Sequence, residues 1–201
     1  MLAIGFDPST DGAAYAVLEV GRESGARVFR LCGEWSMAEI EDRLVYYAGN
    51  QNDARARGLT SEDVIVVVER PSGIHIHPPK PMPLPMLVKE YSTKLMMARS
   101  SGTALMKASY VAGAISMLAK HLGLRSIELA PQQWRTALQA SRTTKDTDQD
   151  AMVKGAVQML IQGWPARSNT HTRDAAGVAL AGWWQVNAER KRAPGAEVFG
   201  G

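Results

Sequence analysis

A run of five β-branched residues, VIVVV at positions 64–68, constrains the fold more than any other feature of the sequence. β-branched side chains favour extended backbone, and a strand without polar positions must be covered on both faces. Such a strand is typical of the middle of a parallel sheet that carries helices on both sides. The run therefore predicts an α/β protein, and Glu69 directly after it places a carboxylate at the end of the most buried strand.

The chain before this run predicts three strands and a helix. The strands cover residues 3–7, 13–20 and 27–35. The turns between them are so short that the strands must pair as antiparallel hairpins. Ser36 and Glu39 then form the Ser-x-x-Glu pattern of a capping box, which predicts that a helix begins there.

The chain after the run alternates between helices and one further strand. We expect a strand at 126–130 and helices at about 100–121, 132–138, 146–162 and 172–188. Six prolines between positions 71 and 85 predict a long exposed loop. The order predicts an α/β fold with a mixed five-stranded sheet, three antiparallel strands and then parallel strands, flanked by helices. We expect one domain over residues 1–188 and a basic, flexible tail over residues 189–201.

Composition excludes several classes of protein. The 201 residues are 45% hydrophobic and 21% charged, which is typical of a globular protein and not of a disordered chain, a collagen or a coiled coil. The single cysteine, Cys32, excludes a disulfide framework and a cysteine-based zinc cluster. There is no apolar stretch long enough to span a bilayer and no basic segment of a signal peptide at the N-terminus. These features predict a cytoplasmic protein with no membrane partner.

Three acids lie at the ends of predicted elements, namely Asp7, Glu69 and Asp174. Singly, each has an ordinary explanation: a turn cap, a polar strand end and a charge in the first turn of a helix. Gathered at one sheet edge, they would raise one another's pKa, and Mg²⁺ or Mn²⁺ would relieve the repulsion. Two such ions can flank the attack of water on a phosphodiester. His171, three residues before Asp174, could bind metal, hold the attacking water or lie on the surface.

Several segments of the sequence, in order along the chain, resemble the RuvC family of Holliday junction resolvases, which have an RNase H-like fold. They are residues 4–8 (IGFDP), 66–69 (VVVE), 101–113, 130–145 and 171–176 (HTRDAA). The resemblance implies that Asp7, Glu69, His171 and Asp174 are catalytic residues and ligands of two Mg²⁺ ions, with Mn²⁺ as a substitute. It also implies a homodimer, formed in part by the long helix, that cuts a four-way DNA junction. From the three acids we expect metal-dependent cutting that leaves 5′-phosphate and 3′-hydroxyl ends.

The chain departs from the family pattern after Glu69. Bacterial members place an aromatic residue about three positions later, whereas here no aromatic residue follows until Tyr91. We therefore expect a divergent member, of the viral type, that cuts other branched DNA as well and discriminates weakly between sequences. Two other classes of function stay open: a DNA-junction binding protein without catalysis, and a relative of actin-like ATPases.

Basic residues gather after Glu69 and again before residue 155, although the net charge is only +3. Lysine and arginine contacts to phosphates supply most of the nonspecific affinity for DNA. Singly, each of these residues also fits an ordinary solvated surface. The residues that we expect to bind DNA are Arg70, His75, His77, Lys80, Lys89, Lys94, Lys107, Arg142 and Lys145. For Lys145, the family resemblance implies a contact with the DNA backbone near the scissile phosphate.

Overall fold

The structure, a computed structural model, describes residues 1–21, 26–49, 63–71, 84–139 and 146–192. At residue 49 and over residues 84–101 and 146–148 it describes the backbone alone. No helix in the described ranges is long and apolar enough to cross a membrane.

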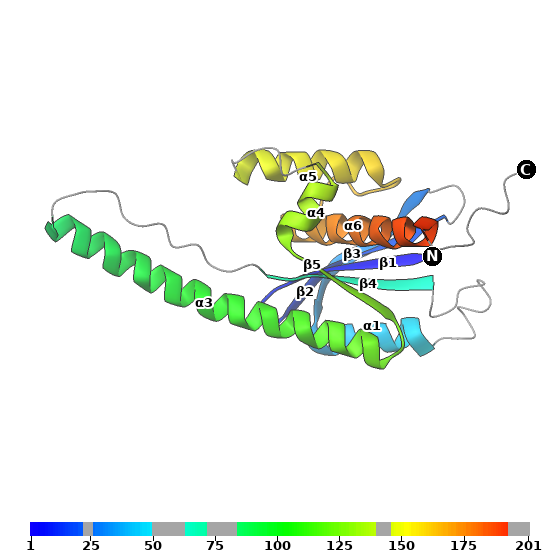
Figure 1. The fold of residues 1–201 in the computed structure, drawn as a ribbon, viewed down its shortest axis with the longest axis horizontal. Helices are drawn as coiled ribbons and strands as arrows, with labels where there is room; N and C mark the ends of the chain where they lie inside the picture. Colours follow the sequence, from blue (N-terminus) through cyan, green and yellow to red (C-terminus); the bar gives the residue numbers. More distant parts are fainter. Residues whose placement is uncertain (22–25, 50–62, 72–83, 140–145, 193–201) are drawn as a thin grey trace, which may run out of the picture.

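One five-stranded sheet, in the order β3-β2-β1-β4-β5, forms the centre of the molecule (Figure 1). The elements β1 (Leu2–Pro8), β2 (Gly12–Val20) and β3 (Arg27–Ser36) pair antiparallel. The strands β4 (Val64–Glu69) and β5 (Arg125–Leu129) run parallel to β1. The β-branched run lies between β1 and β5, and none of its five residues is more than 3% exposed. The predicted mixed sheet is therefore confirmed.

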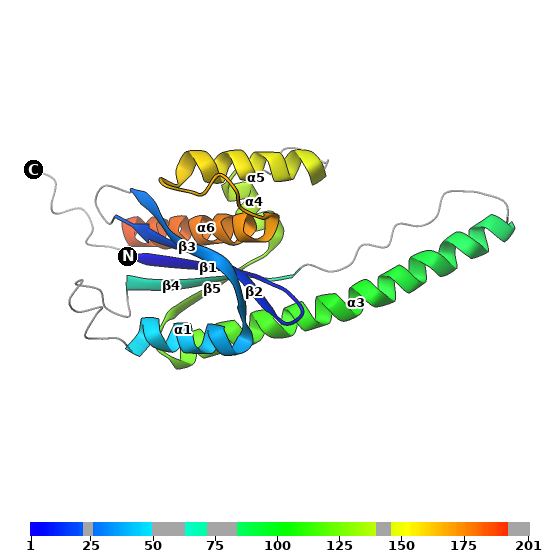
Figure 2. The same cartoon turned by 180° about the vertical axis from the view of Figure 1, so that it is seen from behind.

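Helices cover the sheet on two sides, as both views show (Figures 1 and 2). One side carries α1 (Met37–Gly49) and α3 (Leu84–His121), and the other carries α4 (Pro131–Ala137), α5 (Asp146–Leu160) and α6 (Thr170–Arg192). Alternate residues of the strands enter two separate cores: Ile4 and Val66 face α1 and α3, whereas Ala3 and Ile65 face α6. This alternation is the two-residue period of a strand that is buried on both faces.

The predicted capping box at the start of α1 is confirmed. The backbone N–H and the hydroxyl of Ser36 each donate to the Glu39 carboxylate, both over 2.8 Å. The backbone N–H of Glu39 donates in return to the Ser36 hydroxyl oxygen, over 3.4 Å. The reciprocal bonds satisfy two donors that a helix start leaves without intrahelical partners.

Close packing of α6 on the sheet depends on a glycine in β1. A Cβ atom on Gly5 would lie 1.9 Å from the backbone oxygen of Ala175 and 2.7 Å from the backbone nitrogen of Ala179. Since no side chain fits into such a gap, α6 approaches the β1 backbone more closely than other residues would permit. This approach brings the first turns of α6 to the end of β1 that carries Asp7.

Two predicted boundaries are wrong. The helix α3 begins at Leu84, about sixteen residues earlier than expected, and includes Pro85. A proline in the first turn costs little, because the N–H that it lacks has no intrahelical acceptor there. The helix α6 extends to Arg192, beyond its predicted end at about residue 188, so residues 189–192 of the predicted flexible tail are helical. Cations in the last turn favour this extension through the helix dipole. Residues 72–83 and 193–201 lie outside the described residues.

Candidate active site

The structure brings four predicted site residues, Asp7, Glu69, His171 and Asp174, to one edge of the sheet. Phe6 of β1 is paired with Val68 of β4, so that Asp7 and Glu69 follow directly at the carboxyl ends of two neighbouring parallel strands. His171 and Asp174 come from the first two turns of α6, which contacts both strands. The edge therefore combines carboxylates from three elements that are far apart in the sequence.

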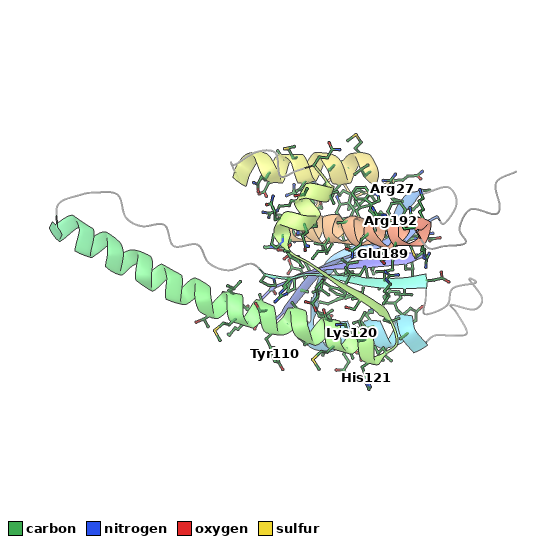
Figure 3. The ribbon with its side chains drawn as sticks, viewed as in Figure 1. Arg27, Tyr110, Lys120, His121, Glu189 and Arg192 are labelled. Carbon is green, nitrogen blue, oxygen red and sulfur yellow. The ribbon has the colours of Figure 1, made fainter. Side chains whose placement is uncertain are left out.

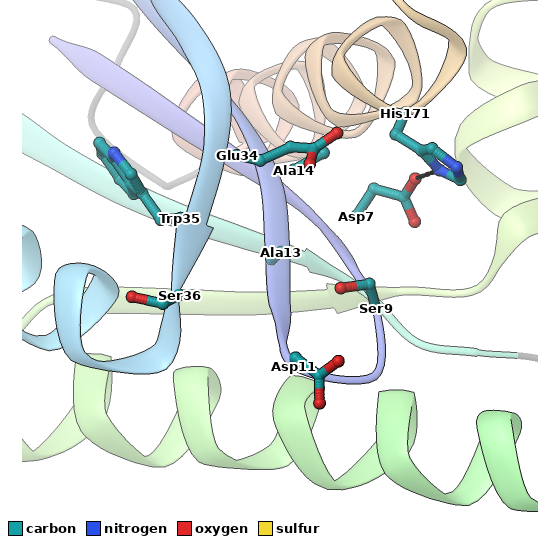
Figure 4. A pocket seen from close by; sticks show the side chains of 9 residues that line it. All are labelled: Asp7, Ser9, Asp11, Ala13, Ala14, Glu34, Trp35, Ser36 and His171. Atoms are coloured by element: carbon teal, nitrogen blue, oxygen red, sulfur yellow. Dashed lines mark hydrogen bonds and ion pairs between the residues drawn. The ribbon is translucent and has the colours of Figure 1, made fainter.

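Asp7 and His171 contact each other directly. The Nδ1 atom of His171 lies 2.8 Å from Oδ2 of Asp7, and the two side chains meet at the rim of a pocket of about 470 Å³ (Figure 4). The Asp7 side chain is only 14% exposed, whereas that of His171 is 70% exposed. Because Nδ1 is engaged with Asp7, Nε2 is the ring nitrogen left for water or a bound molecule.

Burial and mutual repulsion perturb the carboxylates. Burial raises the pKa of Glu69 to about 7, and the negative charge of Asp7 adds to the rise. Burial and the same negative charge raise the pKa of Asp174 to about 6. Burial also raises the pKa of Asp7, against the opposing effect of its bond to His171. That hydrogen bond in turn raises the pKa of His171, since it stabilises the imidazolium form.

The short helix α4 places two further residues in the site. The indole N–H of Trp134 donates to Oε2 of Glu69 over 2.9 Å, and Nη2 of Arg135 lies 4.0 Å from Oδ2 of Asp174. Arg135 belongs to the basic group before residue 155 that was predicted to face DNA, whereas Trp134 was not predicted as a site residue. The sequence gives no signal for the role of Trp134, because a tryptophan in a short helix is more often a core residue than a site residue.

The first turn of α6 is held by Asn169. Its Oδ1 accepts the backbone N–H of Thr172 over 2.7 Å, which is the bond of a helix N-cap. Its Nδ2 donates to Oε1 of Glu34 on β3 over 3.1 Å. This residue thus ties the turn that carries His171 to the sheet. Neither Asn169 nor Glu34 was predicted as a site residue.

The donor set suits a divalent cation in its chemistry. Carboxylate oxygens and one imidazole are ligands that Mg²⁺ or Mn²⁺ accepts, and a cation would offset the repulsion that adds to burial in raising the pKa of Glu69 and Asp174. As the side chains stand, no group of three or more His, Cys, Asp or Glu residues within the described ranges is arranged to hold a metal ion. In this arrangement, Oδ2 of the Asp7 carboxylate is hydrogen-bonded to Nδ1 of the His171 ring.

The residues predicted to bind DNA are only partly described. Arg70 is exposed, directly after Glu69, and its backbone N–H donates to the Leu129 oxygen over 2.8 Å. Lys107 is exposed on α3. Lys89 and Lys94 lie in the part of α3 described by its backbone alone. The other predicted contacts, His75, His77, Lys80, Arg142 and Lys145, lie outside the described residues.

Comparisons with known proteins find likeness in structure and not in sequence. No protein-family profile matches the chain, and no curated protein sequence matches it. The RuvC structure of Thermus thermophilus in complex with a Holliday junction substrate is 14% identical, with a TM-score of 0.54 over 94% of this chain and 96% of that one. A second RuvC structure from Thermus thermophilus is 15% identical, with a TM-score of 0.53 over 94% and 97%. The yeast mitochondrial Holliday junction resolvase Ydc2 is 14% identical, with a TM-score of 0.41 over 94% and 80%.

At this level of identity the likeness to RuvC shows the fold, and it extends over nearly the whole of both chains. The element order and the sheet order observed here agree with it. The chain therefore has a RuvC-type, RNase H-like fold.

Proposed function

We propose that this chain is a metal-dependent endonuclease that resolves four-way DNA junctions. The observation that carries the proposal is the meeting of Asp7, Glu69 and Asp174 at one sheet edge, where the negative charge of Asp7 adds to the raised pKa of both Glu69 and Asp174. Partly buried carboxylates placed close together are costly for stability, and a catalytic role explains why the chain gathers them at one end of the sheet. The fold of a junction resolvase supports the same conclusion.

The three carboxylates and His171 would hold two Mg²⁺ ions, with Mn²⁺ as a substitute. Bound there, the ions would activate a water molecule and offset the charge that develops on a phosphodiester during attack. Hydrolysis of that kind leaves a 5′-phosphate and a 3′-hydroxyl when the bond to the 3′ oxygen breaks. This product polarity is part of the proposal.

The position of the His171 imidazole suits it to proton transfer during hydrolysis. Asp7 holds the ring through Nδ1, which orients Nε2 away from the carboxylate and into solvent. An imidazole held in this way is suited to position a water molecule or to accept its proton. Arg135, near Asp174, supplies positive charge that opposes the rise in the pKa of that carboxyl.

We infer that DNA crosses the sheet edge beside Arg70 and that two copies of the chain act together. The support for a homodimer is an apolar stripe on α3, formed by Met106, Tyr110 and Met117, which are 75%, 78% and 74% exposed. Tyr110 points away from the body of the molecule (Figure 3). Gly113 lies between them in the sequence, and among the described residues no atom outside the adjoining turns of α3 lies within 4 Å of its Cβ position, which leaves room for a neighbouring helix.

The test is incubation with four-way junctions, flaps and duplex DNA, in Mg²⁺ and in EDTA. We expect cutting of the junctions in Mg²⁺ alone, with products whose 5′ ends carry phosphate. Asp7→Asn should abolish cutting and leave junction affinity within about twofold, because it removes a charge from the metal site and no cation that contacts DNA. Tight binding without cutting by the wild-type protein would instead identify a junction-binding protein.

A further inference from the structure

Trp134 of α4 occupies a position between two of the elements that build the site. Its side chain is completely buried, and its indole N–H donates to Oε2 of Glu69 over 2.9 Å. Glu69 comes from β4, whereas the tryptophan comes from the helix after β5. The hydrogen bond is therefore a tertiary contact between residues 65 positions apart.

The other end of the same ring packs against α6. A Cβ atom on Gly177 would lie 2.9 Å from Cζ3 of Trp134, so the absence of a side chain at Gly177 provides the space that the ring fills. Gly177 lies three residues after Asp174 on the same helix, one turn along. One rigid side chain thus contacts the strand that carries Glu69 and the helix that carries Asp174.

This double contact restricts the Glu69 carboxylate. A buried indole N–H without an acceptor is costly, so the ring favours the carboxylate rotamer that satisfies it. One carboxylate oxygen, Oε2, is engaged in this bond, while the side chain as a whole remains partly exposed. Groups that bind a catalytic residue in this way orient it, and their loss commonly lowers activity without removing the residue itself.

We infer that Trp134 is a positioning residue that holds the Glu69 carboxylate in its working orientation relative to α6. The inference rests on the proposed nuclease function. It assigns a role to a residue that itself contacts neither substrate nor reacting atoms. Trp134 acts through two groups: its indole N–H orients the carboxylate, and its ring packs on Gly177. Substitutions can test these two contributions separately.

Trp134→Phe keeps an aromatic ring and removes the donor. Measured under single-turnover conditions on a four-way junction in Mg²⁺, its cutting rate should fall about 10-fold or more. Junction affinity in EDTA should stay within about twofold of wild type, since no cation or surface contact changes. A purely structural role would lower the amount of folded protein and would not separate rate from affinity in this way.

The matched control is Trp164→Phe. Trp164 is also buried, and its indole N–H donates to the Ser168 hydroxyl over 3.1 Å. The control removes the same chemical group from a position that does not contact the acids, so its cutting rate should stay within about twofold of wild type. Wild-type cutting by Trp134→Phe, or equal losses of rate in both variants, would overturn the inference.

A second measurement does not depend on nuclease activity. Thermal unfolding in EDTA at pH 8 is compared for Trp134→Phe, Glu69→Met and the double variant. If the bond orients Glu69, the melting temperature lost on Trp134→Phe should be smaller in the Glu69→Met background, whereas the loss on Trp164→Phe should be equal in both backgrounds. Additive losses for Trp134 would contradict the contact.

The two measurements separate the failure of this inference from the failure of the proposed function. If the wild-type protein cuts no branched DNA in Mg²⁺ or Mn²⁺ and the unfolding losses are non-additive, the nuclease proposal is wrong and the Trp134–Glu69 contact stands. If wild type cuts and Trp134→Phe cuts equally well, the nuclease proposal stands and the positioning role is wrong.

Discussion

Three carboxylates placed together without a cation act against the stability of the folded chain. The raised pKa values of Glu69 and Asp174 mean that the folded protein binds protons at these groups more tightly than the unfolded chain does. For Glu69, this difference extends from its ordinary pKa of 4.5 to about 7. Within this range the free energy of unfolding falls as pH rises, because the folded state must give up the more tightly held proton.

The residue-scale prediction is that Glu69→Gln stabilises the protein at pH 8 in EDTA. Glutamine has the shape of the protonated acid and no charge to bury. We expect the free energy of unfolding to rise by about 1–2 kcal/mol, which corresponds to a rise of about 3–6 °C in Tm. This value is reduced for solvent screening, because Glu69 is partly exposed. The gain should shrink at pH 5, where wild-type Glu69 is protonated in the folded state, and it is measured by thermal unfolding at both values.

The same variant at pH 8 should respond less to Mg²⁺. Wild type should gain Tm on addition of Mg²⁺, because an ion that binds the folded state stabilises it by mass action. A wild-type Tm that is independent of Mg²⁺, together with no gain for Glu69→Gln at pH 8, would contradict the charge repulsion that the site is inferred to hold.

At the scale of elements, the start of α6 determines where His171 lies. Asn169 caps this helix and is also hydrogen-bonded to Glu34 of β3. It therefore ties the first turn of α6 both to the helix backbone and to the sheet. The capping box of α1 supplies a comparable cap in another helix, at Ser36, which lines the same pocket but is bonded to Glu39 and not to one of the four site residues. The two caps therefore allow the loss of a helix cap to be compared with the loss of a cap that also supports the site.

We expect Asn169→Ala and Ser36→Ala each to lower the free energy of unfolding by about 1 kcal/mol. Only Asn169→Ala should lower the cutting rate, by about 10-fold, because small displacements of a reacting group are costly in rate. Denaturant unfolding and single-turnover cutting measure the two effects. Equal cutting rates in the two variants would show that the orientation of α6 does not depend on this cap.

At the scale of the whole molecule, α3 leaves an apolar surface exposed. The helix buries Val111, Ile115 and Ala119 against the sheet, while Met106, Tyr110 and Met117 face away from it. Exposed large apolar side chains that follow one another at four and seven residues lie on one helix face, and such a face is suited to another helix. The proposed homodimer would cover this face.

The prediction for the assembly is that Met106→Glu weakens the dimer. Light scattering at micromolar concentration should give the mass of two chains for wild type and a shift toward one chain for the variant. Met159→Glu is the matched control, because Met159 is equally exposed, at 80%, on α5. A wild-type protein that is a monomer both with and without junction DNA would contradict the proposed dimer.

The sequence by itself determined the centre of the fold and the acids at its edge. Local pattern is sufficient for these features: a β-branched run without polar positions must be a doubly covered strand, and short turns permit only antiparallel hairpins. The Ser36–Glu39 box was predictable for the same reason, since both partners lie within one helical turn. The start of α3 was not predictable, because proline generally breaks a helix, although the first turn of a helix accepts it.

The tertiary structure decided which side chains contact the acids. The bond between His171 and Asp7 joins residues 164 positions apart, and that between Trp134 and Glu69 joins residues 65 apart. Neither pairing follows from periodicity, because each depends on how closely α6 and α4 approach the sheet. The approach of α6 is set by the missing side chain at Gly5, and the seat of Trp134 by that at Gly177. Steric fit between distant elements is a property of the packed chain, and no local pattern encodes it.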